Sequence, residues 1–196
     1  MATAPSRTRR TNSDSFRTKQ RRFADPKYGP VIVPLLRSIR PRHWVKNAVV
    51  LAAVMFSEHL LDVDYLLRSL AAAGVFVLLS AAVYLINDLA DIDADRLHPD
   101  KARRPIASGD LPRSVAIGAA VLLLIGGLSG ARLLHADFAL VALVYVALNL
   151  AYSLGLKREA LVDILMVAAG FLLRAVGGAV VIEVDISTWF IACTFT

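Results

Sequence analysis

The fold can be read from residues 66–95, LLRSLAAAGVFVLLSAAVYLINDLADIDAD, in which a long apolar run ends in a cluster of acidic side chains. The apolar part, Leu66–Ile86, approaches the roughly 20 residues that an α-helix needs to cross about 30 Å of hydrocarbon. The polar part, Asn87–Asp95, follows directly, and charged side chains near lipid are costly unless water, a partner or an ion reaches them. The stretch therefore predicts a membrane helix with a polar site at its C-terminal end.

The rest of the chain supports an all-α membrane protein. Of its 196 residues, 57% are hydrophobic, and the mean hydropathy is +0.58, which is more apolar than a soluble domain of this size. A sixth apolar run begins at Ser187 and is cut off at Thr196, so we expect the chain to be a fragment with about five and a half membrane helices. The five full runs are Trp44–Leu61, Leu66–Ile86, Ser114–Leu134, Asp137–Leu156 and Ala160–Ile182.

The positive charges mark the expected cytoplasmic side. Twelve of the 22 basic residues lie in residues 1–46, five in the loop 87–113 and two at Lys157-Arg158. Because basic loops stay cytoplasmic, we expect the N-terminus and both loops on the cytoplasmic side of the cell (plasma) membrane. We therefore assign the net charge of +6 to membrane topology and expect no nucleic-acid partner.

The basic, Ser/Thr-rich residues 1–30 show no periodicity and predict a disordered cytoplasmic tail. The transmembrane domain is expected over residues 31–196. The single cysteine, Cys193, excludes an intrachain disulfide.

Helical phase groups the acidic residues. If the helix continues past Ile86 at about 100° per residue, Asn87, Asp91 and Asp95 share the face of Asp88, whereas Asp93 points away. Mg²⁺ prefers such oxygen ligands and shares its shell with water and substrate phosphates. Because carboxylates on one face repel, a bound cation is expected to supply counter-charge. The alternative is a solvated helix cap whose acids are balanced by nearby basic residues.

Basic residues around this stretch are candidate phosphate ligands. Lys101, Arg103 and Arg104 follow a helix break at Pro99, and Lys and Arg bind phosphate oxygens well. They could equally form the basic cytoplasmic loop of any membrane protein. Lys46 lies just inside the first apolar run and is expected to face the bundle interior.

The fifth apolar run carries two charges. Asp163 and Arg174 are eleven residues apart, which places them on nearly the same face but about 16 Å apart along the helix, so they cannot pair directly. Each must find a partner or water inside the bundle. Both are therefore functional candidates or parts of an interhelical polar lock. Tyr152 could bond substrate or serve as an interfacial aromatic.

These residues resemble the UbiA prenyltransferase superfamily. The pattern Asn87-Asp88-x-x-Asp91-x-x-x-Asp95, followed by KARRPIASG at 101–109, is similar to the first Asp-rich motif of that superfamily. Within it, RPRHWVKN at 40–47 and GFLLRAVGG at 170–178 resemble the branch that transfers phosphoribose to polyprenyl phosphates. The resemblance covers about residues 35–196.

The resemblance implies a UbiA-type bundle of nine helices with a cytoplasmic polar cavity. The implied reaction is Mg²⁺-dependent transfer of 5-phosphoribose from phosphoribosyl diphosphate to a polyprenyl (decaprenyl) phosphate. It releases diphosphate and leads to the lipid-linked donor of cell-wall arabinan. A second Asp motif of the family would lie beyond Thr196, and the protein could form a homo-oligomer.

On this resemblance the acids hold the metal and the basic residues hold phosphates. Asp88, Asp91 and Asp95 are the expected catalytic residues and, with Asn87, the expected Mg²⁺ ligands. The expected phosphate-binding residues are Lys46, Arg103, Arg104, Lys157, Arg158, Arg174 and Tyr152. The nearest alternative is a UbiA-type aromatic prenyltransferase that uses a prenyl diphosphate. A second alternative is a cation transporter with Asp163 and Arg174 on its path.

Overall fold

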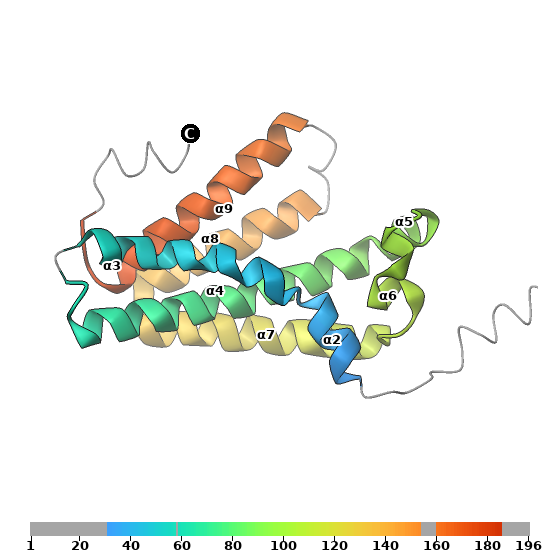
Figure 1. Cartoon of the computed structure of the whole chain (residues 1–196), viewed down its shortest axis with the longest axis horizontal. Coiled ribbons are helices and arrows are strands. Elements are labelled where there is room, and N and C mark those ends of the chain that lie inside the picture. The colour runs from blue at the N-terminus through green and yellow to red at the C-terminus, as the bar shows by residue number, and fades with distance from the viewer. Residues whose placement is uncertain (1–30, 58, 154–159, 186–196) are drawn as a thin grey trace, which may run out of the picture.

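The computed structural model describes residues 31–57, 59–153 and 160–185, and in these ranges it contains only helices and their connections (Figure 1). The expected all-α fold is therefore confirmed. Three predictions fall outside the described residues. They are the disordered tail 1–30, the phosphate contacts of Lys157 and Arg158, and the sixth apolar run.

Helix α4, Val63–Ala90, is the central helix of the bundle. It begins after Asp62, whose carboxylate accepts a hydrogen bond from the Asp64 backbone N–H at 3.0 Å and so satisfies a donor that has no partner within the helix. It lies lengthwise beside α7, Arg113–Leu134, while α8, Ala136–Ala151, and α9, Ala160–Val181, cross the pair obliquely (Figure 1).

The segment before α4 differs from the single α-helical span predicted over Trp44–Leu61. Residues Pro41–Leu51 form a 3₁₀-helix, η1, which continues into the short helix α3, Ala52–Phe56. The segment stops at Ser57, which has extended backbone and whose hydroxyl accepts the His59 backbone N–H at 3.4 Å. A 3₁₀-helix this long is uncommon and often marks a functional or strained segment.

The described helices have the lengths and surfaces of a membrane protein. Helices α4 and α7, together with Val162–Val181 of α9, are long and apolar enough to cross a membrane, whereas α8 is shorter. Large apolar side chains are more than half exposed on the outward faces, including Ile117, Leu122 and Leu140. Lipid is the environment in which such faces are stable, and the predicted membrane class is confirmed.

Two adjacent glycines bring α9 close to its neighbours. A Cβ added to Gly178 would lie 2.0 Å from the backbone oxygen of Val50 in η1, and one added to Gly177 would lie 2.8 Å from the Phe76 ring of α4. The Phe76 ring in turn packs edge-on against Tyr145, with the ring centroids 5.3 Å apart. Close approach at small residues is typical of helix packing in membranes.

The chain order gathers the polar segments at one end of the bundle (Figure 1). Helix α4 ends there, η1 and α7 begin there, and α8 returns toward the same side. The described residues that precede and begin η1 thus lie with the acidic loop, as predicted. Four short elements complete this end: α2, Ile32–Ser38; α5, Ile92–Leu97; η2, Lys101–Arg103; and α6, Pro105–Ser108.

Candidate active site at the end of α4

The acidic residues lie where α4 ends. The helix stops at Ala90, Asp91 has φ −94° and ψ 7°, and α5 begins at Ile92. The uninterrupted helix that the phase argument assumed is therefore broken at one residue. The helical hydrogen-bond spacing nevertheless continues, because the Asp95 backbone N–H donates to the Asp91 backbone oxygen at 2.8 Å.

This geometry agrees with the helical phase for Asp88, Asp93 and Asp95, while Asn87 and Asp91 are half-buried. Asp88 and Asp95 are each only 2% exposed. The Asp93 side chain is 95% exposed and lies 3.7 Å from Arg96. Because an unpaired buried carboxylate is costly, Asp88 and Asp95 require partners from elsewhere in the chain.

Arginines supply those partners. Arg104 Nη1 donates to Asp88 Oδ1 at 3.1 Å and to Asp95 Oδ2 at 2.8 Å, and Arg40 Nη2 donates to the same Asp88 Oδ1 at 2.6 Å. These two guanidinium groups supply counter-charge to the two buried carboxylates, as in the alternative in which nearby basic residues balance the acids. The expected bound cation stays a prediction.

Sequence reasoning missed Arg40 as a site residue. It precedes η1 with φ 51° and ψ 65°, a left-handed backbone that residues other than glycine rarely adopt. Its guanidinium carbon lies 5.0 Å from the centre of the Tyr84 ring, within cation–π range. The Arg-Pro-Arg sequence at 40–42 was the available signal, but it is 48 residues away from Asp88.

The loop that carries Arg104 is held in place by local packing. Pro105 at the first turn of α6 suits a helix start, and the following Gly109 has φ 88°, which glycine adopts without strain. Arg96 Nε donates to the Ala107 oxygen at 3.1 Å and so ties α5 to α6. The apolar cluster beneath includes the buried side chains of Leu85, Ile92, Ile106 and Leu111.

The two residues that follow α8 make further polar contacts. Ser153 Oγ donates a hydrogen bond to Asn87 Oδ1. Tyr152 donates its hydroxyl to Asp163 Oδ1 of α9 at 2.6 Å. Tyr152 therefore joins α8 to α9, and its predicted contact with substrate stays a prediction.

Arg174 is part of a second, deeper polar cluster. It is 7% exposed, and it donates to Asn47 Oδ1 at 2.7 Å, the Gly170 oxygen at 2.7 Å and the Tyr145 hydroxyl at 2.9 Å. Asn47 also donates to Ser80 Oγ at 3.3 Å. Arg174 and Asp163 thus find separate partners, as their spacing predicts, and this arrangement is the interhelical lock that was one of the two interpretations.

Two further basic candidates face outward. Lys46 and Arg103 are exposed and make no ion pair with any residue of the described ranges. For Lys46 this differs from the expected position inside the bundle. Asn47, the next residue of η1, was expected to face the interior as well and is buried, with 2% exposure.

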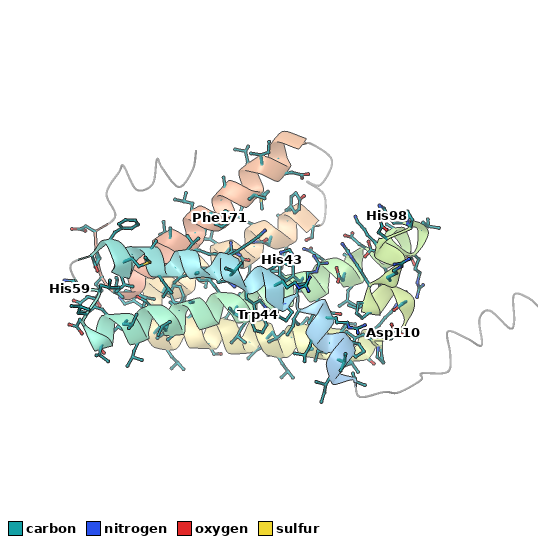
Figure 2. The ribbon with its side chains drawn as sticks, in the orientation of Figure 1. His43, Trp44, His59, His98, Asp110 and Phe171 are labelled. Atoms are coloured by element: carbon teal, nitrogen blue, oxygen red, sulfur yellow. The ribbon has the colours of Figure 1, made fainter. Side chains whose placement is uncertain are left out.

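The chemistry of the donors fits Mg²⁺ if substrate oxygens complete its shell. Within the described ranges, three or more His, Cys, Asp or Glu side chains do not converge on one point that could hold a metal. Figure 2 shows His43, His59 and His98 in three separate regions. The carboxylates of Asp88 and Asp95 are oxygen ligands of the kind that binds Mg²⁺ together with phosphates and water.

Known proteins share this fold. The UbiA prenyltransferase family model matches residues 47–196, and the chain belongs to that family. Two relatives are decaprenyl-phosphate phosphoribosyltransferases. The one from Mycobacterium tuberculosis is 42% identical over 82% of this chain and 55% of its own length. The one from Mycolicibacterium smegmatis is 41% identical over 86% and 55%, respectively.

A solved structure supports the fold. The UbiA homolog from Archaeoglobus fulgidus, bound to DMAPP and Mg²⁺, superposes with a TM-score of 0.66 over 82% of this chain and 58% of its own, at 21% identity. The chain therefore spans a little over half the length of each of these proteins. The predicted resemblance to UbiA proteins is confirmed.

Proposed function

We propose that this end of the bundle binds 5-phosphoribosyl diphosphate with Mg²⁺ for transfer of 5-phosphoribose to a polyprenyl (decaprenyl) phosphate. One observation carries the proposal. A buried pair of carboxylates, Asp88 and Asp95, bridged by Arg104, lies at the end of a membrane-length helix. The chain's identity with phosphoribosyltransferases supports the same substrates.

In the proposed reaction the bond from C1 of ribose to the diphosphate breaks, and a bond from C1 to the lipid phosphate oxygen forms. Asp88, Asp91, Asp95 and Asn87 would hold Mg²⁺, which neutralises charge on a diphosphate leaving group when bound. The exposed Lys46 and Arg103 are available to phosphate oxygens. The acceptor phosphate is already ionised at neutral pH, so the chain needs no general base.

The apolar outer faces of the bundle can accommodate the second substrate, the polyprenyl phosphate. The exposed apolar side chains of α7 and α8 can lie against a polyprenyl tail, while the acidic site lies at the end of the bundle. We place that end on the cytoplasmic side of the cell membrane, because the basic residues of the described segments 31–46 and 87–113 are concentrated there. The product would enter synthesis of the cell-wall arabinan donor.

A second candidate function is transfer of a prenyl group from a prenyl diphosphate to an aromatic acceptor. The solved UbiA homolog bound to DMAPP and Mg²⁺ favours this class. A cation transporter is less well supported, because Asp163 pairs with Tyr152 and the buried acids Asp88 and Asp95 gather at one end of the bundle.

Two labelled donors distinguish the enzyme classes. The purified full-length protein is incubated with Mg²⁺, polyprenyl phosphate and labelled phosphoribosyl diphosphate, or with labelled prenyl diphosphate and an aromatic acceptor. We expect organic-extractable label from phosphoribosyl diphosphate, and its loss on addition of EDTA. Label transfer from prenyl diphosphate alone would favour the aromatic prenyltransferase.

A further inference from the structure

We propose that Arg40 is a diphosphate-binding residue. Its guanidinium group stays paired with Asp88 until a divalent cation binds the Asp88 carboxylate. The inference rests on the proposed function, and it adds a residue that the Asp-rich motif does not contain. In this account Arg40 moves from a carboxylate oxygen of the protein to a phosphate oxygen of the donor.

The shared acceptor atom is the first support. Asp88 Oδ1 accepts from Arg40 at 2.6 Å and from Arg104 at 3.1 Å. A divalent cation on this carboxylate would lie close to both guanidinium groups and repel them. Cation binding and the Arg40 contact therefore compete for one side chain.

The position of Arg40 is the second support. Its side chain is 28% exposed, whereas that of Asp88 is 3% exposed, so the guanidinium group can be reached from outside. The Tyr84 ring, 5.0 Å away, lies against the guanidinium group independently of Asp88. The left-handed backbone at φ 51° is of a kind that persists at functional sites, and the planar fork of Arg matches phosphate oxygens.

Charge balance is the third support. The carboxylates of the proposed ligands Asp88, Asp91 and Asp95 and the guanidinium groups of Arg40 and Arg104 sum to −1. A divalent cation added to these groups leaves one excess positive charge, which a diphosphate offsets. The cation and the diphosphate should therefore bind cooperatively, with Arg40 as part of the coupling.

The test is direct binding of Mn²⁺, an Mg²⁺ substitute visible by electron paramagnetic resonance, with and without inorganic diphosphate. In Arg40→Gln we expect Mn²⁺ alone to bind several-fold more tightly, because the guanidinium group that competes for Asp88 is removed. We expect diphosphate in the presence of Mn²⁺ to bind about tenfold more weakly. Arg132→Gln is the matched control, since Arg132 is exposed near the far end of α7, and it should change neither value.

The directions of the changes in Mn²⁺ and diphosphate affinity distinguish the proposed exchange from a purely structural role of Arg40. An unchanged or weaker Mn²⁺ affinity in Arg40→Gln would overturn the exchange, because Arg40 would then only organise Asp88 or play no part. Arg40→Lys keeps the charge and should retain the wild-type Mn²⁺ affinity with part of the diphosphate affinity, which tests the account should Arg40→Gln not fold. If wild-type protein binds no Mn²⁺ even with diphosphate, the proposed metal site itself fails, and the exchange with it.

Discussion

At the scale of single residues, Arg174 shows how a buried cation is accommodated in the bundle. Its Nε, Nη1 and Nη2 atoms each donate to a neutral group, and its guanidinium carbon lies 4.9 Å from the centre of the Tyr145 ring. A lysine has one nitrogen and cannot keep this planar set of bonds. The contacts join η1, α8 and α9, so we expect their main effect to be on the stability of the fold and not on catalysis.

We therefore expect Arg174→Lys to lower the thermal midpoint. Three hydrogen bonds at about 0.6 kcal/mol each in a membrane protein give a loss of about 2 kcal/mol, which corresponds to roughly 4–8 °C. Thermal unfolding in detergent, followed by tryptophan fluorescence, measures the shift, and Arg132→Lys is the control. An unchanged midpoint with more than about tenfold lower activity would instead identify Arg174 as the phosphate ligand that the sequence predicted.

At the scale of elements, the contact between α9 and η1 depends on Gly178. We expect Gly178→Ala to disrupt this contact, because the new Cβ would lie 2.0 Å from the Val50 backbone oxygen, and a backbone atom cannot move aside cheaply. The expected result is a lower yield of folded protein and a thermal midpoint at least about 5 °C lower.

Gly126 in α7 is the matched control for this substitution. A Cβ there would meet nothing within 4 Å, and alanine is the better helix former, so Gly126→Ala should leave the midpoint unchanged or raise it slightly. Size-exclusion profiles and thermal unfolding of the two variants give the comparison. Equal stability of both variants would show that α9 does not approach η1 this closely.

The long apolar helices were the most predictable elements. The run Leu66–Ile86 falls within α4, and Ser114–Leu134 nearly coincides with α7. They were predictable because lipid requires continuous apolar helices long enough to cross it. The 3₁₀ winding of η1 and the break at Asp91 were not predicted. These features depend on tertiary packing, which local periodicity does not encode.

The candidate site was predictable in part for a related reason. The burial of Asp88 and Asp95 and the exposure of Asp93 follow from helical phase over eight residues. The contact of Arg40 with Asp88 joins residues 48 apart in sequence, and no local pattern reports it. The alternative in which nearby basic residues balance the acids is also compatible with the sequence, and it describes these arginine contacts.

At the scale of the whole molecule, the bundle has one end with the acidic site and an opposite end near Asp62 (Figure 1). We expect the acidic end to face the cytoplasm. With Cys193 replaced, a cysteine at exposed Lys101 should react with a membrane-impermeant maleimide only in inside-out vesicles. A cysteine at exposed Asp62 should react only in right-side-out vesicles. The reverse pattern would contradict the orientation that the basic residues predict.

The central claim is that the buried carboxylates at the end of α4 bind the donor diphosphate with its metal. Its most direct test compares transfer of labelled phosphoribose to polyprenyl phosphate by Asp88→Asn and Asp93→Asn in the purified, folded full-length protein. We predict at least about a hundredfold loss for Asp88→Asn and a change of less than about threefold for Asp93→Asn, whose carboxylate is 95% exposed. Full activity of Asp88→Asn, or equal losses in the two variants, would contradict the account.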